Sequence, residues 1–166
     1  MKPFLFIPLL AVLALFQSTI LPYISILGVR PNLILLAVVS WTLLRGLTEG
    51  LTWAFVGGLW FDLLSGGPFG LSALTLVFVA FLASLLEASL FREHIVLLIL
   101  IIGAATVVHG ALYLIFLRIA NHPASTWAAL WRIVIPAALY TSLLTPAVFP
   151  LVLWLHRITW REQLEW

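Results

Sequence analysis

The chain has 166 residues, a formal net charge of +2 and no cysteine. Its residues are 64% hydrophobic and only 8% charged, and its mean hydropathy is +1.21. This composition excludes a soluble globular protein and favours an integral membrane protein. The absence of cysteine excludes disulfides and thiolate metal sites. Because the basic residues are scattered singly, we expect no nucleic-acid partner.

Charged residues, proline and glycine divide the chain into six apolar segments, which predict an all-α membrane protein with about six transmembrane helices in one domain, residues 1–166. The first, fourth, fifth and sixth can cross a core of about 30 Å, whereas the second and third are short. The third covers only about 21 Å, so either it begins earlier or protein surrounds it. A hairpin that re-enters the membrane is the alternative for these two. The segments are Phe4–Leu21, Leu33–Leu44, Leu51–Leu64, Leu71–Phe91, Ile95–Leu117 and Ile133–Leu155.

The basic residues in short loops indicate the orientation of the chain. No small-residue cleavage site follows the first apolar segment, so we expect this segment to be retained as a helix. With the N-terminus in the cytoplasm, Arg30, Arg118 and Arg132 lie outside and five basic residues lie inside. We therefore expect both termini in the cytoplasm. The inside set is Lys2, Arg45, Arg92, Arg157 and Arg161.

Tryptophans and prolines add two further expectations. Six tryptophans fall near segment ends, as in the aromatic belt of a membrane protein. Prolines within the last segment predict kinks there, because each removes a backbone donor. The residues are Trp41, Trp53, Trp127, Trp131, Trp154 and Trp160 for the belt, and Pro136, Pro146 and Pro150 for the kinks.

Asp62 is the only aspartate, and it lies within an apolar run. An unpaired carboxylate near the bilayer centre costs roughly 2.5–3.5 kcal/mol, so we expect it to face a partner or a cavity. In one interpretation Asp62, or alternatively Ser65, accepts hydrogen bonds from the first amides of the helix that begins near Gly70. The alternatives are contact with a partner protein and a small-molecule or proton site.

Asp62 has a similar predicted depth to two other polar residues. At about 1.5 Å per residue, Gln17 lies roughly 20 Å from the cytoplasmic boundary, Asp62 roughly 16 Å and His109 roughly 21 Å. These residues, with Ser18 and Thr19, could form a polar cluster in the outer half of the bilayer if their helices are neighbours. His109 alone is more often a packing residue than a ligand, and we expect no metal site.

Small residues near Asp62 predict a close helix contact. Ala54 and Gly58 lie four residues apart on one helix, and Gly57 adjoins them. Catalytic sets, in contrast, are incomplete. An intramembrane aspartic protease needs two carboxylates that share a proton, and neither a Gly-x-Ser-x-Gly elbow nor a P-loop is present. We expect neither enzymatic activity nor a cofactor.

Several motifs between Phe16 and Leu74 follow one another in a particular order. They are Gln17-Ser18-Thr19, Gly28-Val29-Arg30-Pro31-Asn32-Leu33, Arg45-Gly46, Gly57-Gly58-Leu59-Trp60-Phe61-Asp62-Leu63-Leu64 and Gly70. In this order they resemble the MreD family of bacterial rod shape-determining membrane proteins. Many members have Pro-Asp-Leu where this chain has Pro31-Asn32-Leu33, which argues against a required charge at that position.

The resemblance implies a non-enzymatic scaffold of the elongasome, in the bacterial cytoplasmic (inner) membrane, that helps control cell shape and peptidoglycan elongation. The implied direct partner is MreC, and through it RodA, a penicillin-binding transpeptidase and MreB. We expect the outer halves of the first, third and fourth helices to form a groove for the MreC helix. The family also resembles the substrate-binding subunits of ATP-driven vitamin transporters in size, which gives the alternative function. Residues expected to serve partner binding or packing are Gln17, Ser18, Thr19, Gly57, Gly58, Asp62 and Gly70.

Overall fold

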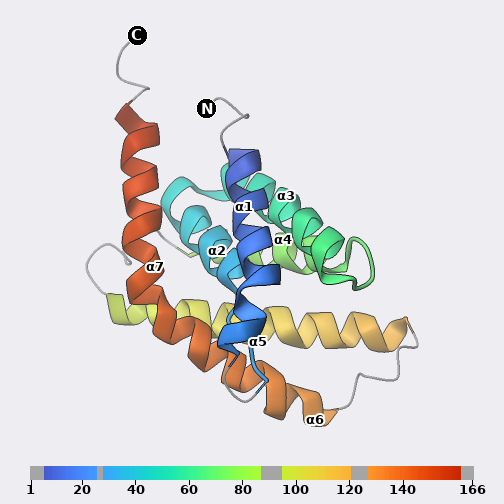
Figure 1. The fold of residues 1–166 in the computed structure, drawn as a ribbon. Coiled ribbons are helices and arrows are strands. Elements are labelled where there is room, and N and C mark those ends of the chain that lie inside the picture. Colours follow the sequence, from blue (N-terminus) through green and yellow to red (C-terminus); the bar gives the residue numbers. More distant parts are fainter. Residues whose placement is uncertain (1–5, 26–27, 87–94, 121–126, 162–166) are drawn as a thin grey trace.

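A computed structural model describes residues 6–25, 28–86, 95–120 and 127–161. The regular elements in these ranges are helices (Figure 1), as the composition predicts. They are α1 (Phe6–Thr19), η1 (Leu21–Ile24), α2 (Leu33–Arg45), α3 (Leu47–Ser65), α4 (Leu71–Ser84), α5 (Ile95–Ile119), α6 (Trp127–Ala129), the π-type turn η3 (Leu130–Val134) and α7 (Ile135–Arg161).

The central element is α2, which contacts α1, α3, α4, α5 and α7. Every residue from Leu33 to Leu43 is buried, whichever side of the helix it lies on. With 13 residues, the helix is about 20 Å long, shorter than a hydrocarbon core of about 30 Å. Protein surrounds this short helix, which is the condition that lets a short segment lie at membrane depth.

The other helix bounds refine the expected segments. The helix α3 begins at Leu47, earlier than the apolar segment alone, and reaches 19 residues. The helix α4 ends at Ser84, so the expectation of a helix continuing to Phe91 is wrong at that end; the Leu85 amide bonds instead to Leu82, three residues back. Residues 87–91 of that segment lie outside the described ranges. Ile95–Ile119 and Leu130–Ile158 are long and apolar enough to cross a membrane, whereas six crossings remain a prediction.

The helix α7 changes direction along its length (Figure 1). Pro146 and Pro150 lie in its interior, and neither can donate to the carbonyl four residues earlier. At its start the Ile135 amide bonds to the Leu130 carbonyl five residues back, which makes η3 a π-type turn directly before Pro136. A bent last helix is what the prolines predict.

The aromatic-belt interpretation is wrong for two tryptophans. Trp41 and Trp53 are buried and stack on each other, with ring centroids 4.2 Å apart. Trp41 is buried because it belongs to the central helix α2. Its indole Nε1 donates to Glu49 of α3 at 3.2 Å. Trp131 and Trp154 are exposed, as a belt requires. The side chains of Trp127 and Trp160 lie outside the described set.

Hydrogen bonds bring the ends of different helices together at two opposite ends of the bundle. At the first, which we call the cap end, Gln17 of α1 bonds to the start of α2, and Ser18 bonds to the Leu64 carbonyl at the end of α3. At the second, the Arg45 end, Arg45 of α2 bonds to His156 of α7. The start of α1 and the end of α7 lie toward the Arg45 end (Figure 1). The helices α1 and α3 therefore run toward the cap end and α2 runs the opposite way, whereas α5 lies across α1 in Figure 1.

Candidate functional site

Asp62 caps the N-terminus of α4. Its carboxylate oxygens each accept the Ser72 amide at 3.1 Å, and Oδ2 also accepts the Ala73 amide at 3.3 Å. Gly70, at the N-cap position with φ +87°, has no side chain to perform this role. Because a helix N-terminus carries free amides and a partial positive charge, a carboxylate there is stabilised while it satisfies them. The side chain of Asp62 is only 3% exposed.

Gln17 and Asn32 cap the N-terminus of α2 in the same manner. Gln17 Oε1 accepts the Ile34 amide at 2.9 Å, and Asn32 Oδ1 accepts the Leu35 amide at 3.0 Å. Gln17 Nε2 donates to Asn32 Oδ1 at 3.3 Å. The backbone amide of Asn32 in turn donates to the Thr141 hydroxyl at 3.1 Å, and this bond joins the start of α2 to α7. The neutral Asn32 therefore caps α2 without a charge.

The two caps follow one rule. In each, a polar side chain near the end of one helix satisfies the second amide of the next helix: Gln17 for α2 and Asp62 for α4. Lipid offers no water to these amides, so an unsatisfied one costs several kcal/mol. The sequence analysis missed Asn32 and Ser72 as participants. An N-cap asparagine directly before an apolar run is the signal that indicates Asn32.

The predicted outer polar cluster divides into two groups. Gln17 bonds within the α1–α2–α7 group, whereas Asp62 belongs to an α3–α4–α5 group. His109 belongs with this second group, because it stacks on Tyr113, whose hydroxyl lies against Gly67 in the turn after α3. Ser18 bridges α1 to α3, and Thr19 is exposed. Gln17 and Asp62 therefore have separate roles, and their common depth in the membrane stays a prediction.

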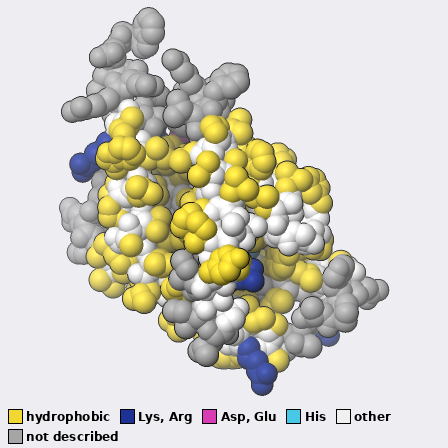
Figure 2. All heavy atoms as spheres, in the orientation of Figure 1, with side chains coloured by type: hydrophobic (Ala, Val, Ile, Leu, Met, Phe, Trp, Pro, Cys, Tyr) yellow, Lys and Arg dark blue, Asp and Glu magenta, His cyan; other side chains and the backbone are white. Residues whose placement is uncertain are grey.

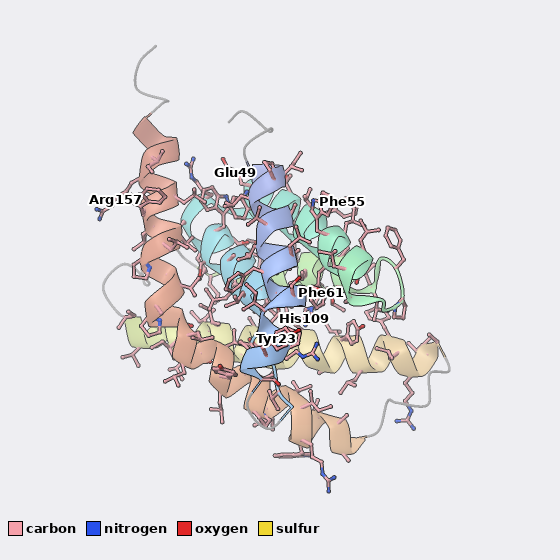
Figure 3. The ribbon with its side chains drawn as sticks, viewed as in Figure 1. Tyr23, Glu49, Phe55, Phe61, His109 and Arg157 are labelled. Atoms are coloured by element: carbon pink, nitrogen blue, oxygen red, sulfur yellow. The ribbon has the colours of Figure 1, made fainter. Side chains whose placement is uncertain are left out.

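His109 and Tyr113 place α5 against the turn between α3 and α4. Their rings stack, with centroids 6.3 Å apart. The Tyr113 hydroxyl lies 2.9 Å from where a side chain on Gly67 would begin. A larger residue at Gly67 would therefore displace Tyr113. His109 is buried, and Figure 3 shows it well away from Glu49, which lies toward the other end.

The small residues of α3 make close contacts inside the chain. A Cβ at Gly58 would clash with the Ala73 Cα and lie 2.6 Å from the Ala73 amide nitrogen, both in the backbone of α4. A Cβ at Gly57 would meet only side-chain atoms, those of Ile34, Leu10 and Val38 at 3.2, 3.5 and 3.8 Å. Ala54 is fully buried as well. Gly57, Gly58 and Ala54 thus pack inside the chain.

A second polar network holds the Arg45 end together. Arg45 and Glu49, four residues apart, form an ion pair with an N–O distance of 3.7 Å. The Arg45 guanidinium also lies over the Trp41 ring, 5.4 Å from its centroid, and its Nε donates to His156 Nδ1 at 2.9 Å. These contacts join the end of α2 to the start of α3 and to α7. The role of this network is therefore to hold these helices together.

The described residues contain no cluster of three or more His, Cys, Asp or Glu side chains that could hold a metal ion. Asp62, Gln17 and Asn32 all bond to helix amides. Most of the face shown in Figure 2 is apolar, with few basic side chains. An apolar helical bundle in which two helices are long and apolar enough to cross a membrane is typical of an integral membrane protein.

The chain belongs to the MreD family: the model of that family, described as rod shape-determining protein MreD, matches residues 1–156. This confirms the resemblance that the motifs carried and implies a role in determining rod shape. No curated protein and no solved structure gives a match.

Proposed function

We propose that this chain is a non-enzymatic scaffold subunit of the elongasome that binds MreC in the bacterial inner membrane. The family match carries the proposal, because it links the chain to shape determination. In this proposal one polytopic domain crosses the membrane about six times, with the cap end outside and the Arg45 end in the cytoplasm. RodA, a penicillin-binding transpeptidase and MreB connect to the chain through MreC.

The proposed docking surface is the apolar face of α1, α3 and α4. The helix α3 contacts both α1 and α4. Large apolar side chains are exposed on all three helices, and Figure 3 shows Phe55 pointing outward from α3. Such a surface suits a single apolar helix, because helices in lipid associate through close packing. The exposed residues are Val12 and Leu15 on α1, Phe55 and Leu63 on α3, and Leu74 and Phe78 on α4.

In this proposal Asp62 maintains the shape of the docking surface and does not bond to MreC. Both of its carboxylate oxygens already accept amides of α4, and its side chain is nearly inaccessible. The glycines beside it are also enclosed. Binding energy then comes from exposed apolar side chains.

Site-specific photo-crosslinking tests this proposal. A photoreactive amino acid replaces Leu63, which is 60% exposed on α3, or Leu143, which is 76% exposed on α7, as the matched control. In cells that also produce MreC, we expect a crosslink to MreC from position 63 and none from position 143. Crosslinks from position 143 alone would move the docking surface to α7. The absence of a crosslink from both positions, with MreC also failing to co-purify, would contradict MreC binding.

A further inference from the structure

Two buried polar atoms, one on α4 and one on α5, have no hydrogen-bond partner among the residues that the structure describes. They are the hydroxyl oxygen of Ser72 and Nε2 of His109. Ser72 is fully buried and His109 is 8% exposed. Buried polar atoms in proteins are almost always hydrogen-bonded, and leaving one unpaired costs about 1–3 kcal/mol. Both atoms therefore call for a partner that the described part of the chain does not provide.

The two residues lie on α4 and α5, which pack against each other. Ser72 lies in the first turn of α4, with its amide 3.1 Å from each Asp62 oxygen. His109 lies in the middle of α5, where its ring stacks on that of Tyr113 with centroids 6.3 Å apart. The Tyr113 hydroxyl lies against Gly67, so this part of α5 is beside the turn that leads into α4. The end of α3, the start of α4 and the middle of α5 thus adjoin one small polar region.

The chemistry of this region fits a water molecule. A water site needs two to four polar partners, and a carboxylate, a hydroxyl and an imidazole nitrogen meet that requirement. Water can donate to Asp62 and can either accept from or donate to His109, whichever tautomer the ring adopts. A metal ion fits poorly, because the described residues hold no cluster of three metal-binding side chains and the one carboxylate is bonded to amides.

We propose that Asp62, Ser72 and His109 bind one internal water molecule, which joins α3, α4 and α5 at the cap end. In this arrangement Asp62 accepts hydrogen bonds both from the amides at the N-terminus of α4 and from the water molecule. Through this water molecule, α5 is hydrogen-bonded to both α3 and α4. It is independent of which partner the chain binds.

Nuclear magnetic resonance of ¹⁵N-histidine-labelled protein in lipid nanodiscs tests this site. The chain has four histidines, so the His109 signal is assigned by its loss in His109→Gln. We expect transfer of magnetisation from a bound water to the His109 ring in the wild-type protein. Lack of such transfer in the wild-type protein would overturn the proposal without any variant.

Two serine variants show whether the water also bonds to Ser72. Ser72→Ala should abolish the water-to-His109 transfer, because it removes one of the partners. Ser40→Ala is the matched control: Ser40 is fully buried on α2 and its hydroxyl also has no partner among the described residues. It should leave the transfer intact. Undiminished transfer in a folded Ser72→Ala protein would exclude the shared site.

Discussion

Replacing Gly58 with alanine should destabilise the protein far more than the same change at the neighbouring Gly57. A Cβ at Gly58 meets the Ala73 backbone, which cannot move without shifting α4. Ala73 also donates its amide to Asp62, so the shift weakens the α4 cap as well. Overpacking costs about 1–3 kcal/mol or more, and loss of a cap adds about 1 kcal/mol. We expect Gly58→Ala to lower the melting temperature by roughly 5–15 °C.

Gly57→Ala is the control for that prediction. Its new methyl group would meet only side-chain atoms, those of Ile34, Leu10 and Val38. Alanine also favours a helix over glycine by about 1 kcal/mol. The stability of Gly57→Ala should therefore stay within about 1 kcal/mol of the wild type. Thermal unfolding followed by tryptophan fluorescence measures both variants. Equal losses would show that α3 and α4 are not in the close contact described.

Replacing Asp62 with alanine should produce the second large effect. The amides of Ser72 and Ala73 would lose their acceptor in a region without bulk water. Each unsatisfied amide costs about 1–3 kcal/mol, so we expect a total of about 2–6 kcal/mol and a melting temperature lower by roughly 5–20 °C. Asp62→Asn retains one acceptor oxygen and should lose about half as much. Thermal unfolding of the purified protein measures the losses.

Two further measurements complete the Asp62 experiment: the stability of the control variant Ser65→Ala and the co-purification of MreC. Ser65 is exposed and makes no bond to α4 among the described residues, so its replacement should leave stability unchanged. MreC co-purification should fall with Asp62→Ala in proportion to the loss of stability. If Asp62→Asn remained stable but no longer retained MreC, then Asp62 would bond to the partner directly, contrary to a role in maintaining shape.

The Gly58 and Asp62 effects should not be additive. Both changes act on Ala73, since it contacts Gly58 and donates to Asp62. Residues that share a partner commonly show coupling energies of about 0.5–3 kcal/mol. The double variant should therefore lose less stability than the sum of the two single losses.

Local sequence signals predicted much of the structure. The apolar runs gave the helices, and a lone aspartate before Gly66 and Gly70 indicated the α4 cap. Those signals depend on nearby residues, because a cap joins a helix to the segment just before it. The pairing of Arg45 with Glu49 is similarly local, four residues along the chain.

The remaining features depend on which helices become neighbours, and one sequence does not specify that. Asn32 bonds to Thr141 and Arg45 to His156 across more than a hundred residues. The same limitation explains the errors. Trp41 and Trp53 fall near segment ends in the sequence but are buried on or against the central helix, and Gln17 caps α2 whereas Asp62 caps α4.

Cysteine accessibility in intact cells tests the central claim, that the cap end is outside and the Arg45 end is in the cytoplasm. The chain has no native cysteine, so single cysteines can be introduced without a background. A membrane-impermeant thiol reagent should label Arg30→Cys and Arg118→Cys from outside. It should label Thr48→Cys and Arg157→Cys, both exposed positions, only after the membrane is opened. Labelling of Arg30→Cys and Arg118→Cys from opposite sides would contradict the account.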